Sequence, residues 1–189
     1  MDYDLKQEIK FFIKKEIDEM ENTPKLVMSF INEETFNNSY LLSFEDIKTI
    51  IPNGRPDFKG LLLSTSRYTI QVFRNGVIQI QIHCFYEDNF FPLVLKEIIE
   101  KSSIFEVVRK IFALKSEKPT LILSCVLDNV LGFSVKNAYW QDSEKPTQQK
   151  RYVLDLLTLN EVPKTMTQEN LFQVFHVIAN IFGHDKWNW

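Results

Sequence analysis

Glycine and cysteine are scarce in this chain, with 5 and 2 residues among 189. The few glycines form no phosphate-cradling loop, because GxGxxG and Walker motifs are absent, as is the GxSxG motif of serine hydrolases. Cys84 and Cys125 lie far apart in hydrophobic segments, and neither belongs to a CxxC or cysteine–histidine pair at metal-ligand spacing. We therefore expect two buried, reduced thiols and no bound cofactor.

Long apolar runs are also missing. No stretch of about 18 consecutive apolar residues occurs, and the N-terminal MDYDLKQEIK is too charged for a signal peptide. These absences predict a soluble, cytoplasmic protein with no membrane association. The net charge of -3 argues against a broadly basic nucleic-acid-binding surface, although a local basic patch is compatible with it.

Apolar residues, by contrast, are plentiful: 44% of the chain is hydrophobic, and 16 residues are phenylalanine. This content suits one domain spanning residues 1–189. Apolar residues at three- and four-residue spacings predict a helix over 2–21, packed at an edge as a peripheral extension. Further helices are predicted over 89–102, 103–116 and 168–183, strands over 25–31, 120–137 and 151–162, and a loop over 53–60. The predicted fold class is α+β, with an antiparallel β-sheet packed on one face by α-helices.

The stretch VFRNGVIQIQIH, residues 72–83, predicts the register of a β-hairpin. A three-residue loop of Arg74, Asn75 and Gly76 lets residues of the same kind oppose one another across the hairpin. The apolar pairs are Val72–Ile78 and Ile70–Ile80, and the polar pairs are Gln71–Gln79 and Thr69–Gln81. We expect the apolar face to be core and the polar face to be largely in contact with solvent.

This polar face is the candidate binding surface, formed by Gln71, Gln79, Gln81 and His83. These side chains either recognise a ligand or keep the sheet soluble, and the sequence leaves both alternatives open. Further candidate residues of the binding surface are Arg67, Arg74, Trp140, Trp187 and Trp189. The tryptophans either pack into the core or form a contact surface. Nucleic-acid binding would require Arg67 and Arg74 to converge with Lys59 and Arg55.

Catalytic and metal-binding patterns are weak. A metal-dependent nuclease needs two carboxylates and a lysine around a divalent ion. Asp46 and the PDFK segment, which contains Asp57, match this requirement only loosely. The three histidines, His83, His176 and His184, have none of the spacings typical of metal sites. We therefore predict no catalytic residue and no metal ligand.

The segments after residue 60 follow one another in an order that is similar to that of a region in known proteins. The chain has, in order, a hairpin with FRNGVI, two helices, the strand segments KPTLILSCVLDNVLGFSV and RYVLDLLTLNEV, and a last helix with an aromatic tail. This order resembles the region that follows the AlbA_2 (Schlafen-like) domain of bacterial regulatory or ATP-binding proteins. The resemblance covers residues 60–189 and carries over no catalytic residue. It implies an accessory or ligand-sensing module in a bacterial regulatory or defence system.

Three functional hypotheses remain. The first is a non-catalytic binding or interaction module with a protein partner or a second copy of itself, since exposed aromatics and sheet edges permit both. The second is a nucleic-acid-associated regulator, which the net charge does not support. The third is a metal-dependent nuclease acting through Asp46 and Asp57. The missing catalytic motifs favour the first hypothesis.

Overall fold

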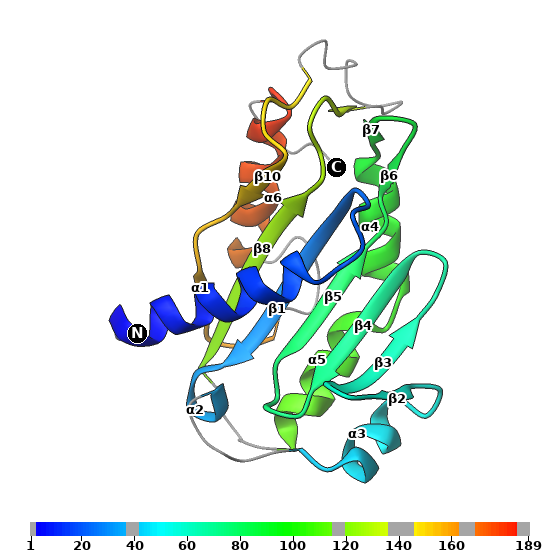
Figure 1. Ribbon diagram of the computed structural model, residues 1–189, viewed down its shortest axis with the longest axis vertical. Coiled ribbons are helices and arrows are strands. Elements are labelled where there is room, and N and C mark those ends of the chain that lie inside the picture. Colours follow the sequence, from blue (N-terminus) through cyan, green and yellow to red (C-terminus); the bar gives the residue numbers. More distant parts are fainter. Residues whose placement is uncertain (1–2, 37–41, 115–119, 136–145, 163–168, 185–189) are drawn as a thin grey trace.

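One antiparallel sheet of eight strands forms the centre of the protein (Figure 1). The computed structural model describes residues 3–36, 42–114, 120–135, 146–162 and 169–184. The strands of this sheet are β1 (Lys25–Asn32), β2 (Arg55–Asp57), β3 (Gly60–Ser64), β4 (Tyr68–Phe73), β5 (Ile78–Ile82), β8 (Leu121–Asp128), β10 (Arg151–Val153) and β11 (Leu157–Leu159). Their order is β10-β8-β1-β5-β4-β3-β2, and β11 also pairs with β8.

Helices and a small second sheet complete the architecture. The helices are α1 (Tyr3–Asp18), α2 (Glu33–Phe36), α3 (Phe44–Ile50), α4 (Pro92–Lys101), α5 (Ile104–Ala113) and α6 (Glu169–Ile181). The second sheet consists of β6 (Phe85–Tyr86), β7 (Asn89–Phe90) and β9 (Ser134–Val135). The predicted α+β class with an antiparallel sheet is confirmed. Among the helices described, none combines the length and the apolar character that a membrane span requires.

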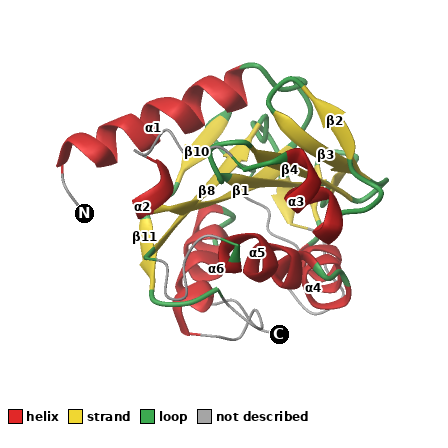
Figure 2. Ribbon diagram, turned by 90° about the horizontal axis from the view of Figure 1, so that it is seen from below, coloured by secondary structure: helices red, strands yellow, loops and turns green. Residues whose placement is uncertain are grey.

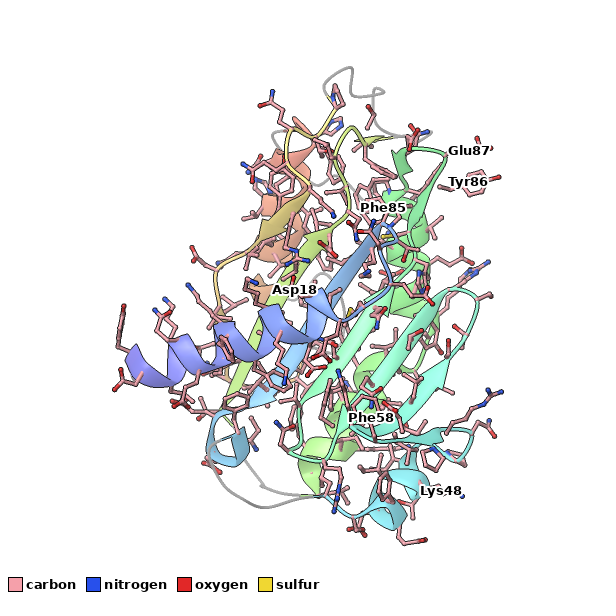
Figure 3. The ribbon with its side chains drawn as sticks, viewed as in Figure 1. Asp18, Lys48, Phe58, Phe85, Tyr86 and Glu87 are labelled. Carbon is pink, nitrogen blue, oxygen red and sulfur yellow. The ribbon has the colours of Figure 1, made fainter. Side chains whose placement is uncertain are left out.

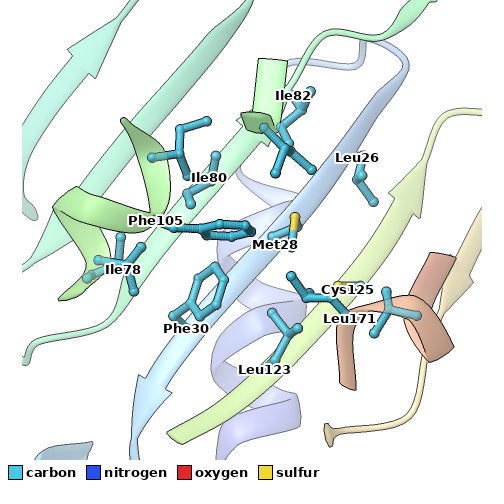
Figure 4. Close-up of a cluster of buried hydrophobic side chains, with 14 of the residues drawn as sticks. Leu26, Met28, Phe30, Ile78, Ile80, Ile82, Phe105, Leu123, Cys125 and Leu171 are labelled. Carbon is cyan, nitrogen blue, oxygen red and sulfur yellow. The ribbon is translucent and has the colours of Figure 1, made fainter. Parts of the chain in front are cut away.

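The main core lies between the large sheet and α4, α5 and α6, which cover one of its faces (Figure 2). Successive residues of a strand point to opposite faces, so every second residue of β1 and β5 enters this core. Met28, Phe30 and Ile80 thus lie beside Phe105 of α5 (Figure 4). The rings of Phe30 and Phe105 meet edge to face with centroids 6.1 Å apart. Full burial of such side chains contributes about 1.5–3 kcal/mol each.

The predicted hairpin register is confirmed. Val72 opposes Ile78 and Gln71 opposes Gln79 in the β4–β5 pair. Gly76 closes the three-residue loop with a φ of 84°, which glycine adopts without the strain that a side chain would add. The Phe73 amide donates to the carbonyl oxygen of Val77 at 2.8 Å and completes the turn.

The predicted position of the N-terminal helix is wrong. Instead of packing at an edge, α1 lies across the sheet face opposite α4, α5 and α6, which we call the α1 face (Figure 2). Ile9 and Ile13 of α1 are buried there in one cluster with Val27 of β1 and Val126 of β8. The edge strands β2 and β10 have three residues each, so they offer the apolar stripe of α1 much less surface.

Three other segments differ from their prediction. Part of the predicted loop over 53–60 is β2, which pairs with β3. The segment after Gly132 does not continue the large sheet, because β9 pairs in parallel with β7. The strand predicted over 151–162 is split into β10 and β11, which pair with β8 in registers that differ by one residue.

Candidate binding site

Four buried polar side chains form a row across the α1 face. Gln71 of β4 opposes Gln79 of β5, Gln79 opposes Ser29 of β1, and Ser29 opposes Ser124 of β8. Gln71 is 7% exposed, and each of the other three is 1% exposed. Within the row, Gln79 Nε2 donates to Ser29 Oγ at 3.3 Å. We call these four residues the buried polar row.

The expectation that the polar hairpin face is in contact with solvent is therefore wrong for Gln71 and Gln79. Both are buried because α1 and the turn between β2 and β3 lie over them. Gln81 and His83 follow on the same face and are half-buried. Burial lowers the pKa of His83, and the nearby charge of Lys25 lowers it further.

A polar pocket opens where one end of this row emerges beside α1. Its volume is about 210 Å³, and α1, the β2–β3 turn, β4 and β5 form its walls. The lining residues, which define the polar pocket, are Glu16, Glu19, Met20, Asp57, Phe58, Lys59, Gln71, Phe73, Gln79 and Gln81. Phe58, labelled in Figure 3, is 86% exposed and is one of the lining residues.

Gln71 leaves a hydrogen-bond donor unused. Its Nε2 is buried and has no hydrogen-bond partner among the residues that the structure describes. A buried polar group without a partner costs about 1–3 kcal/mol, so native proteins rarely retain one without a reason. Gln71 is also one of the residues that line the polar pocket.

A double ion pair closes one side of the polar pocket. Lys59 Nζ lies 2.5 Å from Glu16 Oε2 and 2.6 Å from Glu19 Oε2. Burial alone would lower the pKa of Lys59, but the hydrogen bonds to the two carboxylates outweigh it and raise that pKa. The hydrogen bond from Lys59 lowers the pKa of Glu19. Lys59 is thus held in its charged form and fixes the β2–β3 turn against α1.

The lining of the polar pocket offers groups that can bind a polar molecule. Its carboxylates and amide oxygens accept hydrogen bonds, Gln71 Nε2 donates, and the exposed ring of Phe58 offers an apolar surface. No cysteine, serine or histidine lines it. The two cysteines are free and buried as predicted, and burial raises the pKa of both thiols, which makes them poor nucleophiles.

The arginines proposed for nucleic-acid binding do not converge. Arg67 precedes β4 and Arg74 follows it, so the six residues of the strand separate them by about 20 Å. Arg67 lies 3.5 Å from Glu97, and Arg74 lies over the ring of Phe44. Lys59 is engaged by two carboxylates. Arg67 and Arg74 therefore do not meet in one basic surface.

The carboxylates proposed for a nuclease belong to separate local structures. Asp46 caps α3 together with Ser43, whose hydroxyl donates to Asp46 Oδ2 at 2.6 Å. Asp57 accepts a hydrogen bond from the amide of Phe58 at 2.7 Å. Over the described ranges, no group of three or more histidine, cysteine, aspartate or glutamate side chains is placed to hold a metal ion.

Several residues of the site were missed from the sequence, among them Ser29, Ser124 and Glu16, and three predicted ones lie outside the described residues. Ser29 and Ser124 are polar residues within otherwise apolar strand segments, and that contrast was a usable signal. Nothing in the sequence pattern distinguishes Glu16 from the many other charged residues of α1. The predicted contact residues Trp140, Trp187 and Trp189 lie outside the described residues.

Comparisons with known proteins found no counterpart for this chain. No protein-family model matches it, no curated protein matches it, and no solved structure matches it. The site is therefore interpreted from its own geometry.

Proposed function

We propose that this protein is a non-catalytic binding module and that the polar pocket is its ligand site. The observation that carries the proposal is the buried, unused donor of Gln71, a residue that lines the cavity. A purely structural sheet face is more stable with an apolar side chain at such a position. A ligand that accepts this hydrogen bond accounts for the retention of the amide.

The chemistry of the walls indicates a small polar ligand. Gln71 Nε2 requires an acceptor, such as a carbonyl or hydroxyl oxygen. Glu19 and Asp57 provide carboxylates that accept hydrogen bonds from the same molecule, and Phe58 provides a ring for its apolar side. The volume of about 210 Å³ lies below the roughly 300–1,000 Å³ of typical drug-sized sites, so the ligand is small.

The test is a screen of small hydroxyl- and amide-bearing compounds by nuclear magnetic resonance. We expect a binder to shift the side-chain amide resonances of Gln71. Gln71→Met should abolish its binding, and Gln173→Met, at an exposed position on α6, should leave it unchanged. The proposed site would be refuted by a screen that finds no binder, or by a binder whose affinity is the same for Gln71→Met and Gln173→Met.

A protein partner or homodimer remains a prediction for this module. Large exposed aromatic residues mark interfaces more often than chance, and Phe11, Phe58 and Tyr86 are 72%, 86% and 66% exposed. Sedimentation velocity over a range of concentrations tests self-association. The bacterial regulatory or defence context implied by the Schlafen-like resemblance is likewise still a prediction.

A further inference from the structure

A second cavity lies on the other flank of α1, toward β8 and β10. Its volume is about 340 Å³, within the usual range of small-molecule sites. We call it the apolar pocket; its lining residues are Lys10, Ile13, Lys14, Ile17, Ser124, Val126, Arg151, Val153, Leu154, Asp155 and Leu156. It shares no residue with the polar pocket and does not depend on the function proposed for that pocket.

Aliphatic side chains make up most of the apolar pocket. Ile13 and Ile17 come from α1, Val126 from β8, and Leu154 and Leu156 from the link between β10 and β11. All but Leu156 are buried, so the cavity reaches core side chains. An unfilled cavity with such walls loses dispersion contacts, and an apolar molecule that enters it restores them.

Positive charge dominates the rim. Lys10, Lys14 and Arg151 line the pocket together with a single acidic residue, Asp155, although the whole chain has a net charge of -3. Lys14 pairs with Asp18 at 2.6 Å, and Arg151 pairs with Asp18 at 2.5 Å and with Asp128 at 2.7 Å. Lys10 has no acidic partner in the part of the chain that the structure describes. One lysine without an ion-pair partner among the described residues thus stands beside an aliphatic cavity, whose lining also includes the carboxylate of Asp155.

Ser124 adds a polar group to the inner wall. It is the end of the buried polar row, 1% exposed, and contributes to the lining of the apolar pocket. A hydroxyl can donate to the oxygen of a bound acid.

We propose that the apolar pocket binds a small anionic amphiphile of the medium-chain carboxylate class. The carboxylate lies at Lys10, and the hydrocarbon body packs against Ile13, Ile17 and Leu156. The aliphatic walls select for apolar length, and the lysine selects for negative charge.

The experiment is calorimetric titration of the full chain with octanoate, 1-octanol and octylamine, which share a hydrocarbon chain and differ in the charge of the head group. We expect octanoate to bind more tightly than 1-octanol by about fivefold and octylamine to bind most weakly. Lys10→Glu should weaken octanoate binding by roughly tenfold. Lys15→Glu, which makes the same charge change outside the pocket, should not.

A second variant tests the body of the pocket. Leu156→Trp places a larger side chain at a half-buried wall position and should abolish binding of octanoate, with cooperative thermal unfolding retained. Absence of octanoate binding to the unmodified chain would overturn the proposal. So would equal affinity for octanoate and octylamine, or binding that neither Lys10→Glu nor Leu156→Trp reduces.

Discussion

Lys59 and Glu16, 43 residues apart in the chain, form an ion pair of 2.5 Å that joins the turn between β2 and β3 to the inner side of α1. The side chains of Lys59 and Glu16 are 21% and 9% exposed, so this contact is largely shielded from water. It links the N-terminal helix to the far part of the sheet and forms one wall of the polar pocket.

Replacement of Lys59 by glutamine should lower the free energy of unfolding by about 1–3 kcal/mol, because it leaves the buried carboxylate of Glu16 without its cation. Urea unfolding followed by circular dichroism measures the loss. The matched control is Lys101→Gln, which breaks a solvent-exposed pair with Glu97 and should cost less than about 0.5 kcal/mol. Equal losses in both variants would contradict the role of the Lys59–Glu16 pair.

Acid should loosen the end of α1. Hydrogen bonds from Lys14 and then Arg151 lower the pKa of Asp18, and a hydrogen bond from Lys59 lowers that of Glu19. A carboxyl group with a lowered pKa in the folded state stabilises the protein above its unfolded pKa, and this contribution is lost as the pH falls through the folded value. Stability should therefore decrease as the pH falls below the ordinary values of 4.5 for Glu19 and 3.8 for Asp18.

The measurement is the free energy of unfolding between pH 6 and pH 2, on the unmodified chain and on Lys59→Gln. The variant should show a weaker dependence on pH, since the pKa of Glu19 then lies closer to its ordinary value. Lys48→Gln, which removes an exposed lysine of α3, serves as the control and should preserve the full dependence. A variant curve parallel to that of the unmodified chain would argue against this assignment.

Gln71 and Gln79 should respond in opposite ways to the same substitution. Gln71→Met removes an unused donor and should leave stability unchanged or raise it by up to about 1 kcal/mol. Gln79→Met removes the hydrogen bond to Ser29 and should cost about 1 kcal/mol. Thermal and urea unfolding of both variants give the comparison, and a marked loss of stability in Gln71→Met would indicate a structural role for that amide.

Gly60 should tolerate no side chain. A Cβ at this position would lie 2.0 Å from the carbonyl oxygen of Val72 in the neighbouring strand, so Gly60→Ala should cost about 3 kcal/mol or more. Gly132 has a φ of 84° but open space around it, and Gly132→Ala should cost only about 1 kcal/mol of backbone strain. Equal unfolding free energies for the two variants would show that the β3–β4 contact is not close.

The sequence was sufficient to predict the features that depend on one strand, one hairpin or one helix boundary. The alternation in VFRNGVIQIQIH was sufficient to predict the register of β4 and β5. A shift by one residue would turn the glutamines toward the apolar core under α4, α5 and α6. Ser102 and Ser103 marked the joint between α4 and α5 correctly. Such local patterns do not depend on the rest of the fold.

The burial of the glutamines could not be predicted in the same way. The periodicity of α1 shows that one side of the helix is apolar, but it does not specify which surface receives that side. Once α1 lies across the sheet, Gln71 and Gln79 are enclosed. The wall that Glu16 and Lys59 contribute to the polar pocket depends on the same long-range placement.

The position of β1 has a consequence for the order in which the protein can acquire its structure. This early strand pairs with β5 on one side and with β8 on the other, so neither of its neighbours exists when the ribosome releases it. Strand pairing between distant segments is slow because a long loop of chain must first be closed. Until residue 128 has been synthesised, β1 has one open edge and α1 lacks the part of its surface that Ile122 and Val126 of β8 provide, so assembly of the sheet around β1 waits for β8.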